Sequence, residues 1–264
     1  MPSLFLQPDR SGAQPLQGAN SATTASADTH PVLVELFTSE GCSSCPPADA
    51  LLEKMDAFQP IAGAQLIVLS EHVDYWDHDG WKDPNSSSSL TERQNSYEAA
   101  LGVKGPYTPQ FIVDGHVELR QGDPQRMDET LKKARDTPKV PVTIDDLNFD
   151  AANPAVLRAR IRTGDNFGKH GANVYVALAL DRVESQVLRG ENGGRHLVHV
   201  AVVRQMVKVG KLPKGKNFDQ EVQLKLNPDE DPRNLRVVAF IQEDGPGPVL
   251  GAELRKPAGR SENK

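Results

Sequence analysis

Cysteine is scarce in this chain of 264 residues, and long apolar runs are missing from its sequence. The only two cysteines are Cys42 and Cys45, which excludes a multi-disulfide framework and a zinc site made of four cysteines. No run approaches the roughly 18 apolar residues that a membrane-spanning helix needs, so we expect no membrane span. P-loop, dinucleotide-binding and nucleophile-elbow motifs are also missing, and the sequence indicates no cofactor.

Positive charge is neither abundant nor clustered. The formal net charge is −6, and Lys and Arg are dispersed along the chain. Proteins that bind nucleic acid usually carry a basic patch or stripe. We therefore expect no nucleic-acid partner.

A readable signal peptide is missing from residues 1–30. A leader needs an apolar core of about 7–15 residues, whereas only Leu4-Phe5-Leu6 is apolar here. The small residues at 19–22 and 25–27 are nevertheless typical of a cleavage region. Two interpretations of residues 1–30 stay open, a disordered tail and a leader-like segment. Residues 258–264 are expected to form a flexible tail.

What the chain does contain is a C-x-x-C motif at Cys42 and Cys45, followed by Pro46 and Pro47. An apolar run at 32–37, typical of a buried parallel strand, precedes the motif, and a pattern of helical spacing follows it. A helix N-terminus offers unpaired N–H groups and positive dipole potential, which favour a thiolate. The sequence thus indicates a redox dithiol.

The hydrophobic pattern and turn signals of residues 31–137 predict an alternation of strands and helices. The predicted order is a strand at 32–37, a helix from the cysteines to 58, a strand at 65–70, a helix at 89–101, a hairpin at 110–114 and 117–120, and a helix from 123–124 to 134. This order is similar to the minimal thioredoxin fold. Thioredoxin-like proteins place a cis-proline before the third core strand, and Thr108-Pro109 lies at that position. X–Pro bonds adopt cis readily, so we predict a cis bond at Pro109.

Residues 138–257 have a different texture. Short strand-like runs separated by Gly, Pro, Asn and Asp occur at 140–149, 156–162, 173–180, 197–204, 218–226, 235–241 and 249–254. Their number and spacing predict an all-β sandwich domain of immunoglobulin-like type. The predicted fold class is therefore an α/β thioredoxin-like domain followed by a β-sandwich.

Several strings resemble one bacterial family, domain of unknown function 1223. They are VELFTSEGCSSCPPAD at 34–49, HVDYWD at 72–77, GWKDP at 80–84, YTPQ at 107–110 and ENGGR at 191–195, with Leu197, His199 and VVR at 202–204. The resemblance implies a thioredoxin-like fold and a periplasmic or secreted protein. This chain departs from the family in having no readable signal peptide, so a cytoplasmic location stays open.

The redox interpretation assigns roles around the motif. Cys42, nearer to solvent, is expected to attack as the thiolate, and Cys45 to resolve the mixed disulfide. Ser43 and Ser44 are expected to tune the reduction potential. Thr108 and Pro109 are expected to offer backbone to an extended substrate.

Two further features have alternative interpretations. Glu35, an acid within the apolar strand, is either a buried proton acceptor for Cys45 or a residue facing a sheet edge. The segment 71–83, which holds His72, Asp74 and Trp76, is either a substrate-facing loop with proton-transfer groups or a structural cover over the cysteine helix.

The leading functional hypothesis is a thiol–disulfide oxidoreductase whose partner is a protein or a small thiol. One alternative is a copper or zinc protein in which His72 or His78 joins the cysteines, although no metal ligand set is assigned. The other is a non-catalytic interaction protein with a permanent disulfide. The sequence does not specify the oligomeric state.

Overall fold

The computed structural model describes residues 29–120, 123–228 and 230–258, and its elements follow the predicted patterns closely. The predicted tails, residues 1–30 and 258–264, lie outside this description except for residues 29–30 and 258. The first half contains β1 (His30–Thr38), α1 (Pro46–Phe58), β2 (Ala64–His72), α2 (Ser88–Leu101), β3 (Gln110–Val113), β4 (Val117–Arg120) and α3 (Pro124–Arg135). The second half contains β5 (Val142–Phe149), β6 (Val156–Thr163), β7 (Ala172–Gln186), β8 (His196–Leu212), β9 (Asp219–Lys225), a 3₁₀ turn at Pro232–Asn234, β10 (Leu235–Glu243) and β11 (Val249–Arg255).

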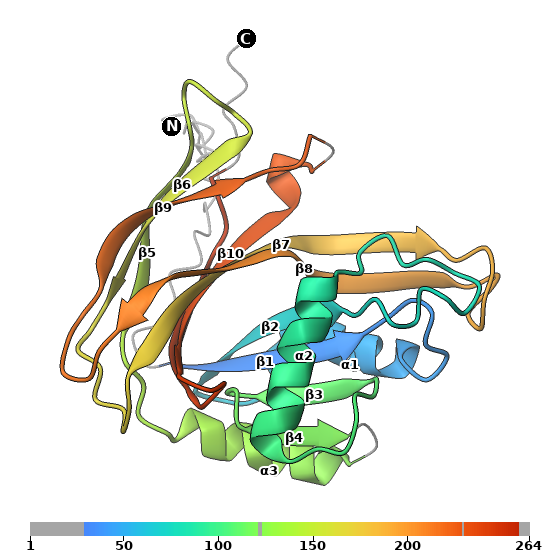
Figure 1. Cartoon of the computed structure of the whole chain (residues 1–264), viewed down its shortest axis with the longest axis horizontal. Helices are drawn as coiled ribbons and strands as arrows, with labels where there is room; N and C mark the ends of the chain where they lie inside the picture. Colours follow the sequence, from blue (N-terminus) through green and yellow to red (C-terminus); the bar gives the residue numbers. More distant parts are fainter. Residues whose placement is uncertain (1–28, 121–122, 229, 259–264) are drawn as a thin grey trace, which may run out of the picture.

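The assembly of these elements contradicts the predicted fold class. Strands from both halves form one eight-stranded mixed sheet in the order β11-β10-β7-β8-β2-β1-β3-β4 (Figure 1). β1 and β2 are parallel, and β8 joins β2 in parallel through the pair Ser70 and Val202. The chain is therefore not a thioredoxin-like domain followed by a separate sandwich, because four strands of the second half continue the sheet of the first.

The hydrophobic core explains why the halves do not separate. One cluster contains Leu33 and Ile67 of the first half together with Val238 and Phe240 of β10. All four side chains are fully buried. Since burial of each large apolar side chain stabilises the fold by about 1.5–3 kcal/mol, two independent domains would lose this shared core.

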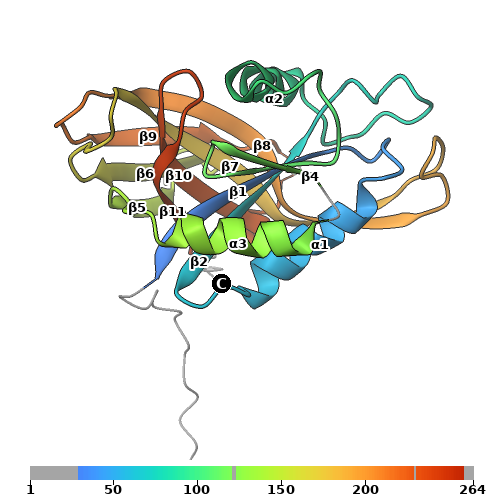
Figure 2. The ribbon, with the colours of Figure 1, turned by 90° about the horizontal axis from the view of Figure 1, so that it is seen from below.

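Helices cover both faces of the first-half strands. Successive side chains of β1 point to opposite faces of the sheet. Val34 and Leu36 pack with α1 and α3, whereas Leu33 lies on the face that α2 covers. Figure 2 shows α2 on one side of the strands and α1 and α3 on the other. None of the helices among the described residues is long and apolar enough to cross a membrane.

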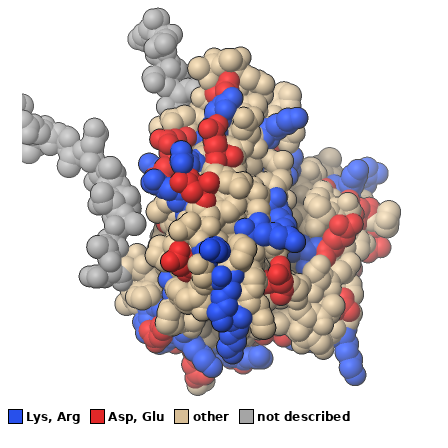
Figure 3. All heavy atoms as spheres, turned by 60° about the vertical axis from the view of Figure 1, so that its left-hand side comes forward, with Lys and Arg blue, Asp and Glu red and all other residues tan. Residues whose placement is uncertain are grey.

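The remaining strands, β5, β6 and β9, form a small antiparallel sheet. Its apolar side packs on β7 and β10 in a second large cluster that includes Leu157, Ile161, Val176 and Ile241. Its outer side carries ion pairs such as Arg160 with Asp219. Charges of both signs are interspersed on the face that holds this sheet (Figure 3).

Candidate functional site

The two cysteines form a disulfide at the start of α1. Cys42 and Cys45 are bonded, and Cys45 is the N-cap residue of the helix, with Pro46 and Pro47 in the first turn. The loop after β1 reaches this position through two successive turns, in which the Cys42 N–H bonds the Ser39 carbonyl and the Cys45 N–H bonds the Cys42 carbonyl, both at 3.2 Å. The strand–turn–helix arrangement is the one that the motif predicts.

Both cysteines are completely buried, which differs from the expectation of a solvent-facing Cys42. The segment 187–195, at the tip of the long β7–β8 hairpin, is bonded to the cysteine loop. Asn192 Nδ2 donates to the carbonyl oxygens of Glu40 at 2.8 Å and of Cys42 at 2.9 Å. Glu191 accepts from the Ser43 N–H at 3.2 Å, and hydrogen bonding by the Ser43 side chain and then by this N–H lowers the pKa of the exposed Glu191 carboxyl. We call this segment the hairpin cover.

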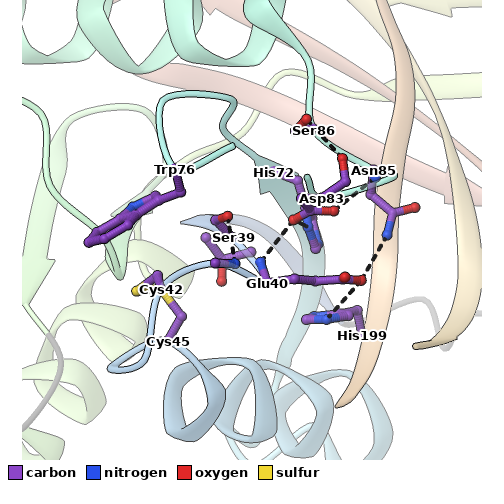
Figure 4. Close-up of polar contacts among 12 residues, drawn as sticks. Ser39, Glu40, Cys42, Cys45, His72, Trp76, Asp83, Asn85, Ser86 and His199 are labelled. Atoms are coloured by element: carbon purple, nitrogen blue, oxygen red, sulfur yellow. Dashed lines mark hydrogen bonds and ion pairs between the residues drawn. A yellow bond between two sulfur atoms is a disulfide. The ribbon is translucent and has the colours of Figure 1, made fainter. Parts of the chain in front are cut away.

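A second cover comes from the loop after β2. The Cα of Gly41 lies so close to Trp76 that a Cβ there would be 3.0 Å from the Trp76 Cβ. The Trp76 ring N–H donates to the Thr108 hydroxyl at 2.8 Å. The Thr108–Pro109 peptide bond is cis, as the sequence predicts. Trp76 thus links the cis-proline segment to the cysteine loop, and Figure 4 shows its ring beside the disulfide.

Of the two serines between the cysteines, Ser44 is the one that contacts sulfur. Its hydroxyl lies 3.4 Å from Cys42 Sγ, within reach of a hydrogen bond to sulfur. Ser43 instead contacts the hairpin cover through its backbone N–H.

A buried polar cluster lies to one side of the disulfide (Figure 4). We define it as the inner cluster, made of Glu40, Asp49, His72, Asp83 and His199, each at most 5 % exposed. His72 Nδ1 lies 2.7 Å from Asp83 Oδ2, and the same oxygen accepts from the Glu40 N–H at 2.8 Å. The rings of His72 and His199 meet edge to face, with centroids 4.7 Å apart.

Electrostatics fix the charges of one pair in this cluster. Burial disfavours charge on His72, yet Asp83, assisted by Asp49 and Glu40, raises its pKa above the ordinary value. Burial likewise disfavours charge on Asp83, but His72 and the N–H groups of Glu40 and Asn85 lower its pKa to about 2. At neutral pH Asp83 is therefore a carboxylate beside an imidazole that holds its proton more firmly than usual.

Glu35 occupies neither of its two expected places. It lies on central strand β1, on the face opposite α1, and both of its carboxylate oxygens are bound by α2. Arg93 Nε donates to one oxygen and the Tyr97 hydroxyl to the other, each at 2.6 Å. Burial and the nearby Glu35 raise the pKa of Glu71 well above its ordinary value. Glu35 belongs to a buried ion-pair cluster away from the disulfide.

Asp74 also points away from the cysteines. The Thr91 hydroxyl of α2 donates to its carboxylate at 2.6 Å, and its N–H donates to the same hydroxyl. In the described parts of the chain, no three His, Cys, Asp or Glu side chains are arranged to hold a metal ion, and His78 is exposed.

The sequence interpretation missed Glu40, Asp49 and Asp83 and assigned no role to Asn192. Glu40 directly follows a buried strand, and Asp83 ends an acid-rich segment, which are usable signals. Asn192 lies in a glycine-rich turn that looks like any exposed turn. In the sequence His199 stands out only as one of the residues that carry the family resemblance.

Comparisons with known proteins agree with this architecture. The crystal structure of a protein from Agrobacterium tumefaciens is similar at 28% identity and a TM-score of 0.69, over 90% of this chain and 100% of that one. HBP35 of Porphyromonas gingivalis shares the fold at 15% identity and a TM-score of 0.66, over 89% of this chain and 78% of that one. None of the curated proteins matches the chain significantly. Residues 33–242 match the family described as protein of unknown function (DUF1223), and the chain belongs to that family.

Proposed function

We propose that this protein is a thiol–disulfide oxidoreductase that uses Cys42 as the exchanging cysteine and Cys45 as the resolving one. The observation that carries the proposal is the disulfide at the N-terminus of α1. A thiolate at Cys42 would lie in the positive potential of the helix end. Because Pro46 and Pro47 have no N–H group, the first turn offers fewer amide donors than usual, and the Ser44 hydroxyl supplies a contact instead.

The exchange oxidises two client thiols and reduces the cysteine pair. A client thiolate attacks Cys42 Sγ, which forms a mixed disulfide and breaks the Cys42–Cys45 bond, and Cys45 leaves as a thiolate that takes up a proton. A second client thiolate then attacks the client sulfur of the mixed disulfide, which breaks its bond to Cys42 and releases Cys42 as a thiolate. The client leaves as a disulfide, and two electrons have moved from the client to the cysteine pair.

Access to Cys42 requires that a cover opens. Since both sulfurs are buried beneath the hairpin cover and Trp76, a protein client can attack only after one of these segments moves. Thr108 and Pro109 would then offer their backbone to an extended client segment. Opening of this kind is common for loops that cover reactive groups.

The reduction potential tests the proposal. The full chain is equilibrated in glutathione buffers and free thiols are trapped and counted. We expect a reversible two-electron transition between about −120 and −270 mV, the span of redox-active dithiols. Cys45→Ser should accumulate a mixed disulfide with glutathione, whereas Cys42→Ser should not. A pair that stays oxidised below about −300 mV would be a structural disulfide and would refute the proposal.

A further inference from the structure

His199 is a fully buried histidine whose two ring nitrogens form no hydrogen bond with the described residues. Buried polar atoms nearly always have a partner, so each exception calls for an explanation. The backbone close to His199 is also unusual. Ala201, two residues later on β8, is buried with a φ of 53°, in the left-handed region that residues with a side chain rarely adopt.

The nearest charges to His199 come from both sides of the disulfide. Its Nε2 lies 3.9 Å from Glu40 Oε1, and its Nδ1 lies 3.7 Å from Asp49 Oδ1. Glu40 precedes Cys42 by two residues. Asp49 lies one helical turn after Cys45, and its N–H bonds the Cys45 carbonyl at 3.1 Å. The imidazole is thus held between two carboxylates that flank the cysteine pair.

One carboxylate oxygen of Asp49 is an open hydrogen-bond acceptor among the described residues. Its Oδ1 accepts from the Thr38 hydroxyl at 2.8 Å, while its Oδ2 is buried and has no hydrogen bond within the described residues. Asp49 Oδ1 and His199 Nδ1 are now 3.7 Å apart. A small movement that shortens this separation to hydrogen-bond distance would bring the two side chains into direct contact. Asp49 Oδ2 is thus an open acceptor on a side chain that neighbours His199 and stands on the first turn after Cys45.

Charged and polar side chains lie around His199. Glu40 and Asp49 lie beside its two ring nitrogens, and the ring of His72 meets it edge to face. These neighbours are bonded in turn to further polar groups: His72 to Asp83, Asp83 to Asn85, Asn85 to Arg204, and Arg204 to Glu230.

We propose that His199 is a positioning residue that exchanges the dithiol proton through Asp49. The inference rests on the proposed oxidoreductase function. When Cys45 resolves a mixed disulfide, its proton passes to the Asp49–His199 pair, its sulfur bonds Cys42 Sγ, and the client leaves with the electron pair as a thiolate. During reduction of the disulfide the same pair returns the proton to the Cys45 thiolate.

The test measures the rate at which Cys45 resolves the mixed disulfide between Cys42 and glutathione, at pH values from 6 to 9. For His199→Gln we expect resolution slower by on the order of 10²-fold at pH 7. The difference in rate between His199→Gln and the unmodified protein should shrink as the pH rises, because Cys45 then ionises without help. His196→Gln, an exposed histidine on the same strand, is the control and should resolve at the unmodified rate. A variant slowed equally at every pH, or not slowed at all, would overturn the proposal.

A second measurement needs no variant and so avoids any failure to fold. The ring nitrogens of His199 are followed by NMR in the oxidised and the reduced protein, with His78 as the exposed reference. We expect the titration of His199 to shift between the two states while that of His78 does not. An identical titration in both states would refute the role of His199. A failure of the unmodified protein to form any mixed disulfide would instead refute the oxidoreductase function.

Discussion

Asn192→Ala should expose the disulfide to reductants without changing the cysteines themselves. The side chain fastens the hairpin cover through two hydrogen bonds, at 2.8 Å to the Glu40 carbonyl and 2.9 Å to the Cys42 carbonyl. Each such bond contributes about 0.5–1.5 kcal/mol. Asn192 Oδ1 is buried without a hydrogen bond to the described residues, which offsets part of this stabilisation.

The expected loss is therefore about 1–2 kcal/mol of the free energy that holds the cover closed. Because 1.4 kcal/mol corresponds to tenfold in an equilibrium constant, the open population should rise about 5- to 30-fold. If opening is rapid and precedes attack, the rate of reduction by excess dithiothreitol rises by the same factor. The rate is measured by trapping free thiols at successive times.

Asn166→Ala is the matched control for this experiment. Asn166 is also buried, and its Nδ2 donates to two carbonyl oxygens, those of His170 at 3.1 Å and Leu212 at 3.0 Å. It lies among second-half strands, away from the cysteines. We expect Asn166→Ala to lower global stability while the reduction rate stays within about twofold of the unmodified protein. Equal reduction rates for Asn192→Ala and the unmodified protein would refute the idea that the hairpin cover limits access.

Three further predictions concern stability. Arg93→Met should cost about 3–5 kcal/mol, because it leaves Glu35 buried without its cation; thermal melting that is unchanged would contradict this. Asp83→Asn should cost about 2 kcal/mol at pH 6. Because the pKa of Asp83 is lowered to about 2 in the folded protein, its carboxylate stabilises the fold fully above about pH 4, and this contribution disappears as the pH falls towards 2. Urea unfolding at several pH values should therefore show the Asp83→Asn deficit shrinking below pH 4, and a deficit independent of pH would exclude the ion pair. Gly251→Ala should cost about 1–3 kcal/mol, because its Cβ would lie 2.0 Å from the Val140 carbonyl oxygen, between β11 and the segment before β5; a stability equal to that of the unmodified protein would contradict this packing.

Local structure was well predicted from the sequence because each element has a local cause. The apolar run at 32–37 lies in β1, Asp123 caps α3 with Pro124 in its first turn, and the glycine-containing turn at 114–115 closes the β3–β4 hairpin. The C-x-x-C disulfide at the start of α1 and the cis bond at Pro109 also depend on residues close in sequence.

The assembly of the strands was not predicted, because it depends on which edges meet. The second-half strands alternate as strands of a sandwich do, and alternation alone does not say which sheet a strand joins. A single parallel bridge between Ser70 and Val202 brings β8 beside β2. That bridge replaces a separate sandwich with one continuous sheet.

The same long-range pairing decides the site. The sequence by itself determined the cysteine pair, its place at a helix N-terminus and the proline before β3, since these depend on short-range geometry. Only the tertiary structure decided that Asn192, about 150 residues away, covers Cys42, and that His199 lies between Glu40 and Asp49. The physical reason is that turn and helix signals act over a few residues, whereas burial and charge around the disulfide come from a strand that reaches it through sheet pairing.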